Sequence, residues 1–160
     1  MVQTENNLPD SSRVWVYQSN RAFKQEELVE LKNELDQFGA SWEAHGTKLN
    51  SAIEIYYNQF IVIFVDESGQ EATGCSIDKS VVLVKTIESK YGISLLDRMN
   101  LTYKTDDAVE NIRMADFQKL AQKGQIQNTV TVFNNLVINK AEFISKWEVE
   151  AKDSWHANLF

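Results

Sequence analysis

The chain has 160 residues, a length typical of a single domain that buries a core without disulfide or metal staples. Its net charge of −7 argues against unassisted binding to nucleic acid or to an anionic membrane, because both attract cationic surfaces. The hydrophobic share of 43% is ordinary for a folded protein, and no apolar run is long enough to cross a bilayer. Cys75 is the single cysteine, which excludes an intrachain disulfide and, without other chains, a cysteine-only metal site, and the sequence indicates no cofactor.

Residues 1–10 are polar and lack a basic start followed by an apolar stretch, so we expect no signal peptide and a cytoplasmic protein. We expect residues 1–12 to be a flexible N-terminal segment and residues 13–160 to form one domain. Residues 13–104 are predicted to be its core. Residues 105–160 are predicted to be an appendage packed on that core, because so short a segment buries little apolar surface on its own.

The first third of the chain predicts a strand and a helix. Residues 13–19 are rich in β-branched and aromatic side chains and apolar on both faces, which predicts a strand inside a sheet. Residues 24–38 place leucines and a phenylalanine at helical spacing, and Gly39 is expected to end that helix. Residues 39–49 show no clear period and predict a loop, with a short strand in it as the alternative.

A hairpin, a second helix and a fourth strand follow. Residues 51–57 and 60–66 predict the two strands of a tight hairpin. Apolar residues at helical spacing then predict a helix with Ser76 as its N-cap and Gly92 at its end. Residues 100–104 predict a short strand. The order strand, helix, strand, strand, helix, strand is typical of a ferredoxin-like core in an α+β protein.

The last third predicts shorter elements that make a C-terminal α/β appendage. Asp116 is placed to cap a short helix that ends at Gly124. Residues 129–138 predict a strand. Asn139, with Glu142 three residues later, resembles a capping box and predicts a last helix.

The segment Gly74 to Asp78 stands where the chain begins the second helix. Backbone N–H groups and the helix dipole at such a place can bind an anion or favour a thiolate, so Cys75 is a candidate nucleophile. The alternative interpretation is structural. In it, Ser76 caps the helix, Asp78 complements the dipole and Cys75 packs as a small apolar side chain.

The segment Trp42 to Gly46 contains His45, one of two histidines in the chain. In a ferredoxin-like sheet this connection lies at the same end as the start of the second helix, so His45 is predicted to approach Cys75. The two side chains would then serve as base and nucleophile, with Asp78 or Glu43 available to orient the imidazole. If residues 70–74 formed a further strand, Cys75 would move to the opposite end. The structural alternative for His45 itself is a loop residue that is hydrogen-bonded to the backbone beside Trp42.

Two arginines form a third group of candidates. Arg21 follows the first strand and Arg98 follows the second helix, and the same topology places both at the end of the sheet opposite Cys75. Together they can clamp a carboxylate or a phosphate. The alternative is that each makes a structural ion pair, such as Arg98 with Asp97.

The sequence lacks the motifs of phosphate loops, dinucleotide folds, zinc peptidases and serine hydrolases. Its segments Tyr-Gln-Ser-Asn-Arg, Trp-x-x-His-Gly, Gly-Cys-Ser-Ile-Asp and a closing Ser-Trp, within residues 13–155, resemble a small bacterial protein family sometimes labelled ABC transporter ATPase. The resemblance implies a bacterial, cytoplasmic protein and brings no established reaction or ligand. The positions that it marks for attention are Arg21, Trp42, His45, Gly74, Cys75, Ser76, Asp78 and Arg98.

The leading hypothesis is a non-enzymatic binding or protein-interaction domain. Its partner would be a small anionic ligand, another protein or a second copy of the chain. The alternative hypothesis is a thiol-dependent enzyme that uses Cys75 with His45.

Overall fold

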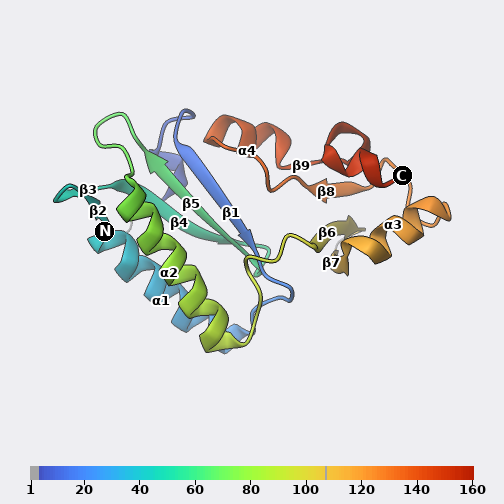
Figure 1. The fold of residues 1–160 in the computed structure, drawn as a ribbon, viewed down its shortest axis with the longest axis horizontal. Helices are drawn as coiled ribbons and strands as arrows, with labels where there is room; N and C mark the ends of the chain where they lie inside the picture. The colour runs from blue at the N-terminus through green and yellow to red at the C-terminus, as the bar shows by residue number, and fades with distance from the viewer. Residues whose placement is uncertain (1–3, 107) are drawn as a thin grey trace.

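The structure is a computed structural model that describes residues 4–106 and 108–160, and within them it contains two larger antiparallel sheets and a third of only two short strands (Figure 1). The first sheet has the strand order β1 (Arg13–Gln18), β5 (Phe60–Asp66), β4 (Asn50–Tyr56). The second has the order β7 (Ala108–Arg113), β6 (Asn100–Thr105), β8 (Thr131–Phe133), β9 (Glu148–Glu150). Antiparallel sheets combined with helices confirm the predicted α+β class.

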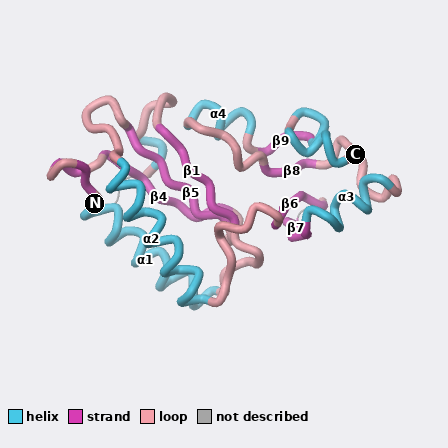
Figure 2. The backbone as a smooth tube through the Cα atoms, in the orientation of Figure 1, coloured by secondary structure: helices cyan, strands magenta, loops and turns pink. Residues whose placement is uncertain are grey.

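The helices α1 (Gln25–Ser41) and α2 (Gly74–Tyr91) lie side by side on one face of the first sheet (Figures 1 and 2). The apolar positions that predicted them face the sheet, and Leu31 and Ile87 are both 0% exposed. Gly92 ends α2 as predicted, because glycine adopts its left-handed φ of 63° without steric cost. No helix in the described part of the chain is long and apolar enough to cross a membrane.

The other face of the first sheet is covered by the C-terminal part of the chain, including α4 (Lys140–Lys146) (Figure 1). An aromatic cluster forms this contact. The Trp147 ring lies 5.0 Å from the Phe60 ring and 4.5 Å from the Phe143 ring, centroid to centroid. The appendage and the core therefore share one continuous apolar interior.

The second sheet has a smaller core of its own. It lies against α3 (Met114–Gln122) and the short helices η2 (Ala151–Asp153) and η3 (Trp155–Leu159). His156 is 1% exposed, its ring stacks on Trp155, and its Nδ1 lies 2.6 Å from Ser154 Oγ. Burial lowers the pKa of His156 to about 4, so the imidazole is neutral at pH 7.

The ferredoxin-like core is not confirmed, because the predicted fourth strand joins the other sheet. β6 forms where it was predicted, but it pairs with β7 over six residues and with β8 at Tyr103. β7 follows β6 almost directly, and a short hairpin closes at a lower entropic cost than a return to β1. The boundary predicted at residue 104 therefore cuts through the second sheet.

β1 is an edge strand, although its apolar pattern predicted a place inside the sheet. Its backbone pairs with β5 on one side. On the other side, it meets an isolated bridge between Arg13 and Asn139 and no strand of the described residues. The pattern arose because both faces of β1 are covered, one by α1 and α2 and the other by the C-terminal part. A strand with both faces buried can therefore still have one edge that pairs with no other strand.

Several local boundaries also differ from the prediction. Thr73, and not Ser76, is the N-cap of α2, since Thr73 Oγ1 accepts a hydrogen bond from Ser76 N at 3.2 Å. Asp116 lies in the first turn of α3 and does not cap it, because the helix begins at Met114. The predicted loop after α1 holds a small hairpin of β2 (Glu43–Ala44) and β3 (Thr47–Lys48).

The segment predicted to be flexible makes defined contacts from residue 4 onward, while residues 1–3 lie outside the described residues. It contains the turn η1 (Glu5–Asn7), and Leu8 is 3% exposed. Lys140 Nζ donates hydrogen bonds of 2.7 Å to the carbonyl oxygens of Glu5 and Leu8. A buried lysine on α4 thus connects the N-terminal segment to the C-terminal part of the chain.

Candidate functional site

The start of α2 and the connection after α1 meet at one end of the first sheet, as the topology predicted. Trp42 is 2% exposed, and its Nε1 donates a hydrogen bond of 2.8 Å to the carbonyl oxygen of Ser76. Residues 70–74 form no strand. Trp42 and Ser76, both singled out as ligand-binding candidates, are buried and bonded to each other, which gives them a structural role.

Cys75, His45 and Asp78 are all exposed, and no hydrogen bond joins them within the described residues. His45 lies at the tip of the β2–β3 hairpin with a φ of 51°. A Cβ added to Gly74 would meet no atom within 4 Å, so no close approach of backbone requires glycine there. No contact among the described residues therefore supports the pairing of a thiol nucleophile with its base.

The reactivity of Cys75 gives a test of the enzymatic hypothesis. We expect iodoacetamide to alkylate Cys75 in the folded protein, because its side chain is exposed, and we expect His45→Gln to leave the rate unchanged. A time course followed by mass spectrometry, with the chain unfolded in urea as the reference, measures both rates. A rate more than about tenfold above the reference that His45→Gln abolishes would instead identify an activated thiol.

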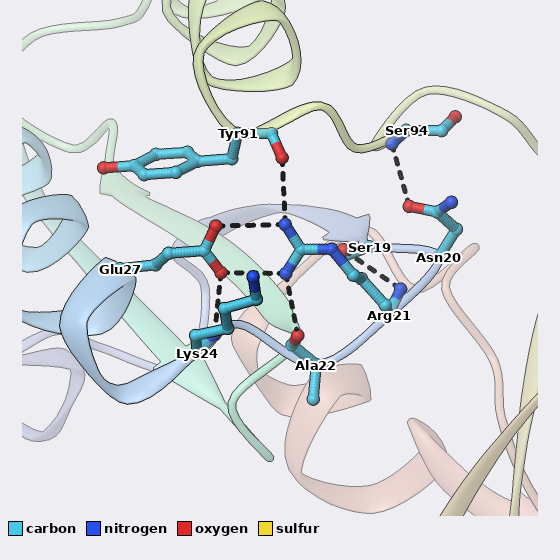
Figure 3. Close-up of polar contacts among 8 residues, drawn as sticks. All are labelled: Ser19, Asn20, Arg21, Ala22, Lys24, Glu27, Tyr91 and Ser94. Atoms are coloured by element: carbon cyan, nitrogen blue, oxygen red, sulfur yellow. Dashed lines mark hydrogen bonds and ion pairs between the residues drawn. The ribbon is translucent and has the colours of Figure 1, made fainter.

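Arg21 makes a structural contact between the two long helices (Figure 3). Its guanidinium donates to both carboxylate oxygens of Glu27, at 2.8 and 3.0 Å, and to the carbonyl oxygens of Ala22 and Tyr91, at 3.1 and 2.9 Å. The hydrogen bonds from Arg21 and from Lys24 N lower the pKa of Glu27 to about 2. Arg21 joins the start of α1 to the end of α2, so the predicted clamp with Arg98 does not form.

Arg98 lies in the exposed segment between α2 and β6. The alternative prediction paired it with Asp97, but Asp97 accepts a hydrogen bond of 2.7 Å from Arg113 Nη1 instead. No hydrogen bond or ion pair engages the Arg98 guanidinium within residues 4–106 and 108–160. Arg98 lines a groove that runs along the open edge of β1.

The groove has a volume of about 750 Å³. Its floor is β1, one wall is the segment 95–101 and the other is the segment 135–138. It lies at the side of β1 that faces away from β5. A fourth strand of a ferredoxin-like sheet would occupy this same edge.

The backbone of β1 offers unused hydrogen-bonding groups to the groove. In an antiparallel pair, alternate residues bond to the partner strand, and Ser19 N donates to Gln59 O at 2.8 Å. The backbone N–H and C=O groups of Trp15, Tyr17 and Ser19 therefore face β5. Those of Val14 and Val16 face the open edge. Val14 N donates to Ile138 O at 3.0 Å. Within the described residues, the N–H and C=O of Val16 have no partner.

Both ends of this open stretch are closed by hydrogen bonds. At one end stands the bond from Val14 N to Ile138 O. At the other, Gln18 Nε2 donates to Asn100 O at 3.1 Å and Asn135 Nδ2 donates to Gln18 Oε1 at 2.9 Å. The free edge is therefore short and is centred on Val16.

Apolar side chains gather on the two walls. Leu96 and Met99 are 40% and 49% exposed on one wall, and Leu136 and Ile138 are 61% and 64% exposed on the other. Of these residues and Val16, the sequence prediction singled out none. Leu96 and Met99 lie outside every predicted element, while Val16, Leu136 and Ile138 lie in predicted strands, where apolar side chains are expected to be buried. Exposed apolar side chains around an unpaired strand edge are typical of a binding surface.

Comparison of the chain with protein-family models, with curated proteins and with solved structures finds no match.

Proposed function

We propose that the protein is an interaction domain that binds an extended peptide segment of another protein along the open edge of β1. The observation that carries this proposal is the unpaired backbone of Val16 at the floor of the groove. A buried or half-buried N–H and C=O that lack partners favour a ligand that supplies both groups, and an extended polypeptide does so at strand spacing. This form of binding adds a strand to the sheet.

The shape of the groove supports one added strand and not a second sheet. Neighbouring strands lie about 4.8 Å apart, and the two walls stand on either side of the position that such a strand would take. Pairing with β1 of a second copy would also bring that copy's segments 95–101 and 135–138 into the same space. The exposed side chains of Leu96 and Leu136 instead offer apolar contacts to alternate side chains of a single peptide.

The thiol-dependent alternative has less support. No hydrogen bond links Cys75 to His45 in the described part of the chain, and a lone exposed cysteine is not a catalytic arrangement.

The proposal is tested with a panel of capped octapeptides composed of valine, isoleucine, threonine and serine, each carrying a fluorescent label. We expect members of the panel to bind, as measured by an increase in the fluorescence anisotropy of the label. We also expect bound peptide to slow hydrogen exchange at the Val16 N–H, because that group becomes a donor to the added strand. Val16→Pro removes this donor without removing a β1–β5 hydrogen bond. We expect it to weaken binding by about tenfold or more.

Leu136→Ser and Val82→Ser make a matched pair, because their side chains are 61% and 62% exposed and only Leu136 lines the groove. We expect Leu136→Ser to weaken binding severalfold and Val82→Ser to leave it unchanged. Circular dichroism confirms that each variant is folded. Equal loss in both serine variants, or no binding by any peptide at millimolar concentration, would contradict the proposal.

A further inference from the structure

We infer that the groove selects peptides in which an acidic side chain stands among the apolar residues, and that Arg98 binds its carboxylate. This inference rests on the proposed function. It adds a charge requirement to a surface that is otherwise defined by backbone and apolar groups.

The groove has a local charge opposite to that of the whole chain. The charged residues that line it are Arg13, Asp97 and Arg98. The negative charge of Asp97 is balanced by Arg113, 2.7 Å away, whose hydrogen bond holds the pKa of that carboxyl below its usual range. In a chain with a net charge of −7, the lining of this groove is therefore cationic.

Of the two arginines, Arg98 is the one available to a ligand. The Arg13 guanidinium lies 4.6 Å from the centre of the Trp15 ring, and its Nη1 lies 3.9 Å from Glu67 Oε1. The Arg98 guanidinium has no such partner within the described residues. Asp97, the carboxylate next to Arg98 in the chain, pairs with Arg113 and not with Arg98.

The place of Arg98 indicates which part of a peptide it meets. It belongs to the wall 95–101, whose buried Leu95 packs with α1 and α2, whereas Val137 of the other wall packs with α4. At Leu95 and Val137 the two walls thus lie on opposite faces of the sheet, and they meet at Gln18, whose side-chain amide bonds to Asn100 and Asn135. Alternate side chains of an added strand point to opposite faces, so some of them are directed to the wall that carries Arg98. The recognised segment then has an acidic residue toward Arg98 and apolar residues toward Leu136.

The test uses the same octapeptide panel with glutamate, glutamine or lysine placed in turn at each position, all with amidated C-termini. We expect the best glutamate peptide to bind about tenfold more tightly than its glutamine counterpart, and the lysine peptide to bind weakest. We expect Arg98→Gln to remove this difference while the glutamine peptide binds as before. Lys79→Gln, an exposed cation on α2 away from the groove, is the control and should change nothing.

The outcomes separate the inference from the proposed function. If glutamate and glutamine peptides bind equally, the charge requirement is wrong and the peptide-binding groove remains. If a neutral peptide with a free C-terminus matches the glutamate peptide and depends on Arg98, the carboxylate belongs to a chain end and the inference is overturned. If no peptide binds, both fail.

Discussion

Replacing Trp147 with alanine is expected to lower the free energy of unfolding by about 3–5 kcal/mol, the range for removing a buried aromatic side chain. Trp147 is 3% exposed and packs against the rings of Tyr56, Phe60, Phe133 and Phe143. Its Nε1 also donates a hydrogen bond of 2.9 Å to Asn135 Oδ1. The substitution empties the contact that joins the C-terminal part to the first sheet.

Urea denaturation followed by circular dichroism measures this loss. Trp147→Phe is the control, because it keeps a ring in the cluster and should cost less than half as much. A loss below about 1 kcal/mol in the alanine variant would show that the C-terminal part stabilises the first sheet only weakly.

The second large effect is a loss of stability in mild acid that His156 causes. The pKa of His156 is about 4 in the folded protein, against 6.5 for the free side chain, so between these values the unfolded chain binds a proton that the folded chain does not. Stability therefore rises with pH across this window and falls as the pH drops through it. We expect about 2 kcal/mol of unfolding free energy to be lost between pH 7 and pH 5.

His156→Gln isolates this contribution, because glutamine does not titrate and can still accept a hydrogen bond from Ser154 Oγ. Urea denaturation at several pH values should give a steep pH dependence for the natural chain and a flatter one for the variant. Glu27, with its pKa lowered to about 2, acts in a separate window, since its contribution is present above pH 4.5 and is lost only as the pH falls toward 2. Identical slopes for the two chains would mean that His156 is not the cause.

The elements that the sequence predicted correctly are those whose own pattern determines them. The helix periodicity of α1 and α2 and the continuous apolar runs of β1 and β5 come from faces that are buried. β7 was missed because most of its residues are exposed and it has no strong alternation of its own. It is a strand because β6 lies beside it. Without β7, nothing in the sequence indicated that β6 would leave the first sheet.

The groove could not be predicted for a related reason. Its floor is an edge, and the pattern of β1 reports only which of its faces are covered. Its walls come from two segments far apart in the chain, 95–101 and 135–138, that meet only when both sheets have formed. Arg98 was identified as a candidate residue, but its expected companion was Arg21, whose guanidinium is taken up by Glu27.

The contacts of Gln18 and Lys140 have a consequence for the order of folding. The hydrogen bond between Asn135 and Gln18 spans 117 positions, and that between Lys140 and the Glu5 carbonyl spans 135. Contacts between such distant positions form late and slow the folding rate. During synthesis, β1 leaves the ribosome early, but the wall formed by residues 135–138 can pack beside it only after residues 135–140 have also left the ribosome. A nascent chain halted before that point would expose the strand edge without its walls, and would then be most prone to pair with the wrong strand.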